Sequence, residues 1–265
     1  MASRRRETQV VAPDALGVEH QLRAVSFGSA ADDYARFRPA PPAEAAEWAV
    51  ARATAGVVID LAAGTGNLSR HLVGRVEKLV AIDIDPRMLS ALGDRLPGVD
   101  RVAARGEQLP IGASTAAAVV ISSAWHWLDP VRAWEELARV ILPGGTFAIM
   151  WSGADRSVEW VADVLSPPGG ETRTEGSRRR WQVDLPRGVP FSQVEERTFT
   201  STIGYAVAEL PRLAASYSHM IVLPPAEKAL AMEAVAARAS TRSELKAVKT
   251  VDLPLRCRVW RAVRE

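Results

Sequence analysis

Residues Val57–Leu68 read VVIDLAAGTGNL, and this stretch decides the fold of the chain. Its first half is apolar and rich in β-branched residues, which is typical of a parallel strand buried on both faces. Glycines follow, and then Leu68 and Leu72 at helical spacing. The stretch therefore predicts a strand, a tight turn, and a helix that begins near Asn67 and ends near Leu72, before Gly74.

The glycine turn indicates a nucleotide-type ligand. Glycine allows a sharp turn and places no Cβ between the main chain and a ligand. A dinucleotide fingerprint requires a third glycine, where this chain has Ser69. Asp60 would repel a pyrophosphate but suits a cationic ligand. The alternative is an ordinary strand–helix turn that binds nothing.

The string DLAAGTG at Asp60–Gly66 resembles motif I of the class I S-adenosylmethionine (SAM) methyltransferases. Two other segments agree in order with the same family. Ile82–Leu89 resembles the segment that follows motif I, and RVILPGG at Arg139–Gly145 resembles the frequent R-V-L-x-P-G-G string. An F-x-x-x-A-x-x-Y-x-x-x-R-P opening at Phe27–Pro39 and an A-x-H-W string at Ala124–Trp127 resemble a subgroup related to trans-aconitate methyltransferase. The resemblance covers roughly residues 27–152 well and the remainder loosely.

The resemblance implies an α/β, Rossmann-like class I methyltransferase fold. Its seven-stranded sheet is expected to be mostly parallel, with an antiparallel last strand and a helical substrate cover. Residues 1–22 are expected to form a flexible tail, and 23–265 one domain with cover insertions within 153–250. Strands are expected at 79–83, 102–104, 116–122, 146–151, 194–202 and 253–263. Helices are expected to begin at 41–42, 85–86 and 129–130, and to lie near 206–216 and 226–239.

Asp83 ends the second expected strand, seventeen positions after Gly66. A carboxylate at that place can accept both ribose hydroxyls of a nucleoside held over the glycine turn. The alternative is that Asp83 only polarises the end of its strand.

The resemblance implies SAM as the cofactor and no metal. Arg38 would lie over the cofactor, where its fork can meet a carboxylate; a solvated surface arginine is the alternative. Met88 would line the adenine pocket, although core packing explains it equally well. Two departures from the family are Arg105 and Ala117, where many relatives carry aspartate. The implied cofactor-binding residues are Tyr34, Arg38, Asp60, Ala62, Gly64, Gly66, Asp83, Ile84, Met88, Gly106, Glu107 and Ser123.

His126 is the candidate catalytic residue. It follows the fourth expected strand, at the edge where open α/β sheets bind ligands. A histidine there can take a proton from a phenol or an acidic hydroxyl as the methyl group arrives. The alternative is that His126 only orients the substrate.

Composition limits the partners of the chain. A formal net charge of +2 over 265 residues gives no indication of a nucleic-acid-binding surface, and one cysteine excludes an intrachain disulfide. With no signal peptide or membrane span expected, a cytoplasmic monomer or homodimer is predicted. Trp125, Trp127 and Trp151 favour an aromatic or apolar small-molecule acceptor, unless they belong to the core. The predicted function is methyl transfer to that acceptor; the alternative is a non-catalytic SAM-binding module.

Overall fold

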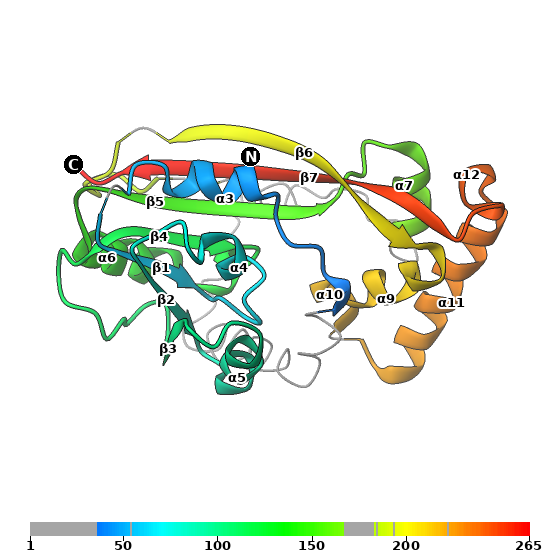
Figure 1. Ribbon diagram of the computed structural model, residues 1–265, viewed down its shortest axis with the longest axis horizontal. Coiled ribbons are helices and arrows are strands. Elements are labelled where there is room, and N and C mark those ends of the chain that lie inside the picture. The colour runs from blue at the N-terminus through cyan, green and yellow to red at the C-terminus, as the bar shows by residue number, and fades with distance from the viewer. Residues whose placement is uncertain (1–35, 54, 167–182, 184, 193, 222) are drawn as a thin grey trace, which may run out of the picture.

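The computed structural model describes residues 36–53, 55–166, 183, 185–192, 194–221 and 223–265. Seven strands form one sheet in the order β3-β2-β1-β4-β5-β7-β6 (Figure 1). Strands β1 to β5 are parallel, and β7 is antiparallel to both of its neighbours. The predicted fold class is confirmed. The strands are β1 (Val57–Leu61), β2 (Lys78–Asp83), β3 (Asp100–Ala103), β4 (Ala116–Ser122), β5 (Ile141–Ala154), β6 (Glu195–Ala206) and β7 (Thr250–Val263).

Short polar caps start two of the central helices. Asp85 accepts a hydrogen bond from the Arg87 N–H, and Asp129 accepts from the N–H groups of Val131 and Arg132. A proline follows each aspartate at the first helical position, as the sequence predicted. The helices are α3 (Ala43–Val50), α4 (Ser69–Leu72), α5 (Pro86–Arg95), α6 (Pro130–Val140), α7 (Glu159–Leu165), α9 (Leu210–Ala215), α10 (Ser218–Ile221), α11 (Pro225–Thr241) and α12 (Ser243–Lys246), with 3-10 turns η2 (Trp125–Trp127) and η3 (Val207–Glu209).

Side chains of each central strand alternate between two apolar layers, because successive residues of a strand point to opposite faces. Val58 of β1 joins one layer with α3, α4 and α5, whereas Ile59 joins the other with α6. Both faces of the sheet are therefore covered, and β1 and β4 lie buried in the middle. Burial on both faces is the reason these strands read as continuous apolar runs.

A third apolar cluster lies beyond the carboxyl end of β5. Helices α7, α9, α11 and α12 build it with the outer parts of β6 and β7 (Figure 1). Helix α7 was not predicted, because its seven residues are too short for a clear periodic signal next to a breaker-rich segment. No helix in the described ranges is long and apolar enough to cross a membrane.

The bounds of several elements differ from the prediction, among them those of α4 and β5. Helix α4 has only one helical turn and begins at Ser69, so its dipole adds little positive potential at the glycine turn. Residues 142–145 were expected to form a turn before the strand, but they belong to β5 itself. The pairing of β5 with β4 is irregular there, because the register shifts between the Ala116–Ile141 and Ala118–Thr146 pairs. The tail 1–22 and most of the 27–39 motif lie outside the described residues.

Candidate active site

The turn between β1 and α4 lies at the carboxyl edge of the sheet, where β1 is flanked by β2 and β4. Ala62, Gly64 and Gly66 adopt left-handed backbone conformations, with φ of 54°, 55° and 83°. The Ala63 N–H donates to the Ile82 carbonyl at 3.0 Å and ties the turn to β2. A left-handed alanine is strained, and such strain is concentrated at functional sites.

The two turn glycines have different roles. A Cβ built on Gly64 would meet no atom within 4 Å, so this position faces open space. A Cβ on Gly66 would lie 2.9 Å from Leu92 Cγ and 3.1 Å from Leu96 Cδ1. Gly66 therefore permits α5 to approach the turn, and its expected part in binding the cofactor stays a prediction.

Asp83 holds the turn from the neighbouring strand. Its Oδ2 accepts from the Gly64 N–H at 2.8 Å, and its Oδ1 accepts from the Asp85 N–H at 2.9 Å. Burial raises the pKa of Asp83 above its ordinary value, and the two backbone hydrogen bonds oppose that shift. Each carboxylate oxygen has a second lone pair, so both can still accept a hydroxyl.

Asp60 is 1 % exposed at the penultimate position of β1. Its Oδ2 accepts from the Ser69 hydroxyl at 2.6 Å, whereas no donor among the described residues reaches the buried Oδ1. Burial raises the pKa of Asp60 to about 7; the Ser69 hydrogen bond opposes this shift, and the charge of Asp83 adds to it. A buried carboxylate oxygen without a donor suits a ligand that brings a proton donor or a positive charge.

Arg38 connects the turn to the end of β5. Its carbonyl accepts from the Asn67 side chain at 3.4 Å, and its Nη2 donates to the Ser152 carbonyl at 3.4 Å. The guanidinium carbon lies 4.6 Å from the centre of the Tyr217 ring. The side chain of Arg38 therefore lies over β5, whereas its backbone contacts the turn. Tyr34, the other residue expected over the cofactor, lies outside the described residues.

Ile84 and Met88 follow Asp83 along the chain. Ile84 is partly exposed after the end of β2, and Met88 is buried on α5 with Leu89 and Leu92. The burial of Met88 agrees with the alternative of core packing, and its expected contact with adenine stays a prediction.

The Gly106–Glu107 loop packs against the start of α6. A Cβ on Gly106 would lie 2.7 Å from Leu128 Cδ2, and Glu107 Oε1 accepts from the Asp129 N–H at 2.9 Å. Arg105, the departure from the family, lies 4.0 Å from Glu107 and pairs with it. The loop is fixed by these contacts, and its expected approach to adenine stays a prediction.

The end of β4 brings Ser123 and His126 to the same edge. Ser123 has a left-handed φ of 58°, and its N–H donates to the Met150 carbonyl of β5 at 2.7 Å. His126 lies in η2, partly buried, with its ring 4.6 Å from that of Trp127. Since β4 is the direct neighbour of β1, the strand ends that carry Asp60 and Ser123 are adjacent.

Two of the three tryptophans expected near the acceptor are core residues. Trp125 is 8 % exposed and packs edge-on against Trp134, with ring centres 5.3 Å apart. Trp151 is 6 % exposed and packs edge-on against Trp260 at 5.0 Å. The expectation that Trp125 and Trp151 face an acceptor is therefore wrong, while Trp127 is partly buried.

Sequence reasoning missed the support behind the turn. Arg95 of α5 donates through Nη1 to the Thr65 carbonyl at 2.9 Å and lies 3.4 Å from Asn67 Oδ1. Ser69, noted only as a missing glycine, is the donor to Asp60. Asp60 and Ser69 are only nine residues apart, on either side of the glycine turn, so the sequence weakly indicated that they meet. Arg95 is 30 residues from Thr65, and no pattern near it in the sequence indicates this contact.

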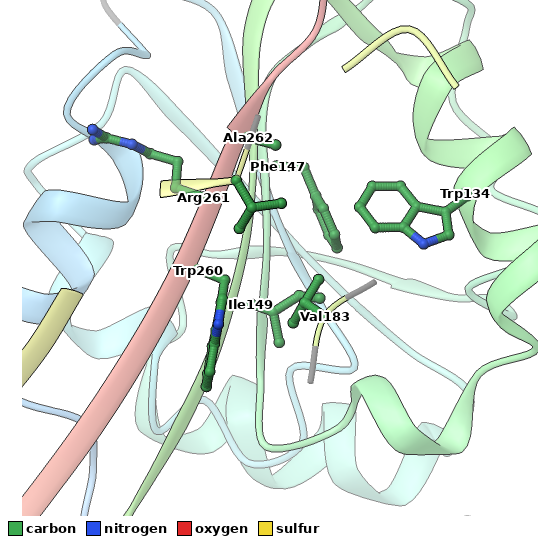
Figure 2. Close-up of a pocket in the computed structure, with 8 residues that line it drawn as sticks. Trp134, Phe147, Ile149, Val183, Trp260, Arg261 and Ala262 are labelled. Atoms are coloured by element: carbon green, nitrogen blue, oxygen red, sulfur yellow. The ribbon is translucent and has the colours of Figure 1, made fainter. Parts of the chain in front are cut away.

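The pocket in Figure 2 is separate from this site, because none of the residues that line it belongs to the turn or to the strand ends described above. It has a volume of about 10 Å³, room for about one water molecule, within the apolar layer beneath α6. No group of three or more metal-ligating side chains occurs in the described part of the chain. The pocket is lined by Trp134, Phe147, Ile149, Val183, Val194, Trp260, Arg261 and Ala262.

Comparisons with known proteins agree with this geometry. Residues 59–149 match the family model of a methyltransferase domain. The chain is 35 % identical over 231 residues to an uncharacterized methyltransferase of Mycobacterium tuberculosis, covering 87 % of this chain and 92 % of that protein. It is 28 % identical over 203 residues to an uncharacterized methyltransferase of Schizosaccharomyces pombe, covering 74 % and 80 %.

Solved structures share the fold. A candidate type II methyltransferase from Anaeromyxobacter dehalogenans superposes with a TM-score of 0.57 at 22 % identity, covering 86 % of this chain and 98 % of that one. A phosphoethanolamine N-methyltransferase of Haemonchus contortus, solved with S-adenosylhomocysteine, gives a TM-score of 0.52 at 12 % identity, covering 97 % and 61 %. The narrower resemblance to the trans-aconitate subgroup stays a prediction. The fold, the family match and the relatives agree, and the chain belongs to the class I SAM-dependent methyltransferases.

Proposed function

We propose that this chain binds SAM at the ends of β1, β2 and β4 and transfers the methyl group to a small-molecule acceptor. One observation carries the proposal. The open space at Gly64, the carboxylate of Asp83 and the buried, unpaired Oδ1 of Asp60 lie at adjacent strand ends. A nucleoside that carries a positive charge matches all three features.

Each of these residues has a defined part. Asp83 would accept the ribose hydroxyls, because its oxygens keep free lone pairs. Asp60 would meet the positive charge of the methionine part through Oδ1, and the Ala62–Gly66 backbone would run beneath the ligand. The resemblance adds Met88, Gly106 and Glu107 on the side of the base, Ile84 next to Asp83, and Ser123 at the end of β4, where the acceptor would meet the methyl group.

Little covalent chemistry is required of the protein. Bound SAM supplies a methyl group that is already electrophilic. The chain must hold the acceptor in line with it, exclude water and receive a proton. His126, one strand away from Asp60, is the residue proposed to hold or take that proton. The helices that follow β5 and β6 would cover the acceptor.

Calorimetry with S-adenosylhomocysteine tests the binding site. Asp83→Ala removes two charge-assisted hydrogen bonds, so the dissociation constant should rise by about a hundredfold or more. Asp94→Ala is the matched control, because Asp94 is an exposed acid on α5. Circular dichroism establishes that both variants fold. Unchanged affinity in a folded Asp83→Ala protein would contradict the assignment of Asp83.

A further inference from the structure

A short segment before α3 is buried at its centre. Residues 36–40, which we call the strap, extend from the side of α9 to α3 (Figure 1). Phe37 of the strap is 1 % exposed, although it belongs to none of the seven strands. A large apolar side chain buried by such a short segment anchors it, because leaving this position would expose apolar surface to water.

One end of the strap is held by the cover, which consists of α7, α9, α11 and α12 with the outer parts of β6 and β7. The Tyr205 hydroxyl, near the end of β6, donates to the Phe37 carbonyl at 3.0 Å. The guanidinium carbon of Arg212 lies 5.2 Å from the centre of the Phe37 ring, and Arg36 pairs with Glu209 at 3.3 Å. All three partners of the strap therefore lie within positions 205–212.

Tyr205 provides the strongest of these three contacts. It is 8 % exposed and belongs to the apolar cluster of the cover. Burial raises the pKa of Tyr205 well above its ordinary value, so the hydroxyl keeps its proton at neutral pH and remains a donor. Loss of that donor would leave a buried carbonyl without a partner. The Arg36–Glu209 pair is exposed and stabilises the strap little.

The other end of the strap lies over the candidate active site. The carbonyl of Arg38 accepts from the Asn67 side chain, and its Nη2 donates to the Ser152 carbonyl. Asn67 follows the glycine turn after β1, Ser152 is on β5, and β4 lies between these strands. Arg38 thus spans the end of β4. Both hydrogen bonds are 3.4 Å long and weak, so the cover holds the strap more firmly than the site does.

We propose that the strap is a gate over the cofactor and that the cover holds this gate shut through Tyr205. The acceptor cover then controls how fast the cofactor enters and how fast its demethylated product leaves. This inference rests on the proposed function, because it assumes that SAM binds at the glycine turn beneath the strap.

A gate has a characteristic effect on kinetics. The Tyr205–Phe37 hydrogen bond is present without a ligand, and it is expected to be present with one. Removing it stabilises the open state equally in the free and the bound protein, so the equilibrium affinity does not change. The rates of association and dissociation rise by the same factor, because the cofactor passes only when the strap is open.

A chase experiment measures the dissociation rate. Protein loaded with tritiated SAM is mixed with excess unlabelled S-adenosylhomocysteine, and the label retained on a filter is followed with time. Tyr205→Phe keeps the ring and removes the hydroxyl, so the rate should rise about fivefold. Calorimetry should give a dissociation constant within about twofold of wild type. Ser216→Ala is the matched control, because this buried hydroxyl donates to the Leu213 carbonyl of its own helix and should leave the rate unchanged.

Arg212→Gln tests the same gate at an exposed side chain, where folding is not at risk. It removes the cation beside the Phe37 ring and should raise the dissociation rate about two- to fivefold. Circular dichroism establishes that each variant folds.

Unchanged dissociation rates in Tyr205→Phe and Arg212→Gln would overturn the proposal. So would a faster dissociation with an equally raised dissociation constant, because the strap would then support the bound cofactor and not gate it. Failure of the wild-type protein to bind either SAM or S-adenosylhomocysteine would instead overturn the proposed function, and this inference with it.

Discussion

At the scale of single residues, Asp60 shows how folding changes the chemistry of a side chain. A carboxyl group in water has lost its proton well below neutral pH, whereas the pKa of Asp60 is about 7 because burial disfavours the charged form. The residue can therefore change its charge near neutral pH. A positively charged ligand beside Oδ1 would favour the ionised form.

This shift predicts a pH-dependent stability. Below about pH 4 Asp60 is protonated in both the folded and the unfolded chain, and its stabilising contribution is fully present. As pH rises through 7 that contribution is lost, because the unfolded state releases its proton first. Asp60→Asn should remove this loss, so the variant should gain up to about 4 kcal/mol in unfolding free energy relative to wild type between pH 4 and pH 8.

Chemical denaturation at both pH values measures the difference between the proteins. Asp94→Asn, a change at an exposed acid, is the control and should show no comparable dependence. A constant difference between Asp60→Asn and wild type across this range would mean that Asp60 is already ionised in the folded protein at low pH.

His126 is the second residue with a testable role. If it removes a proton from the acceptor, His126→Ala should lower kcat by about 10²–10⁴-fold while the affinity for S-adenosylhomocysteine stays unchanged. Steady-state kinetics with an acceptor that the wild-type protein methylates would measure this. A change in KM alone, or in neither constant, would assign His126 to the wall of the site.

At the scale of elements, the turn between β1 and α4 requires glycine at two positions for two different reasons. Gly64 faces open space, and Gly66 faces Leu92 of α5. Gly64→Val should therefore fold with a moderately lower Tm and lose S-adenosylhomocysteine binding. Gly66→Val should lower the Tm much further, because its side chain overlaps the packed leucine.

Gly74→Val is the matched control for this pair. Gly74 also has a left-handed φ, of 75°, and open space around its Cβ position, but it lies at the other end of α4. Gly74→Val should be destabilised by the same backbone strain as Gly64→Val, about 1–2 kcal/mol. Its affinity for S-adenosylhomocysteine should not change. Thermal denaturation and calorimetry test all three variants. Normal binding by Gly64→Val would mean that this turn faces no ligand.

The same scale shows which elements a sequence can reveal. The Asp85-Pro86 and Asp129-Pro130 starts were predictable, because a cap and the proline after it act through neighbouring residues. Helix α7 was not predictable in the same way. Its burial is decided by contacts with α11 and the outer part of β7, which are distant in sequence.

At the scale of the whole molecule, β7 connects the apolar clusters. Cys257 and Val259 belong to the layer with α3, Trp260 to the layer with α6, and Leu253 and Leu255 to the cover. We propose that residues 23–265 unfold as one unit, since no cluster is complete without this strand. Far-UV circular dichroism and tryptophan fluorescence should then give coincident thermal transitions. Two separated transitions would mean that the cover is an independent unit.

The sequence alone determined the sheet, the glycine turn and the position of Asp83. These features depend on local rules: a continuous apolar run forms a buried strand, glycine permits a left-handed turn, and a proline after aspartate starts a helix. These rules imply parallel strands, and the carboxyl ends of parallel strands lie at one edge of the sheet. The sequence could therefore place Asp60, Asp83 and Ser123 at that edge.

Only the tertiary structure decided how particular side chains are used. Packing placed Trp125 and Trp151 in the core, because each found an aromatic partner far along the chain. It also paired Arg256 with Asp155 and Arg36 with Glu209, partners that lie 101 and 173 positions apart along the chain. Which charge pairs with which depends on distances that no local pattern encodes, and for that reason these ion pairs were not visible in the sequence.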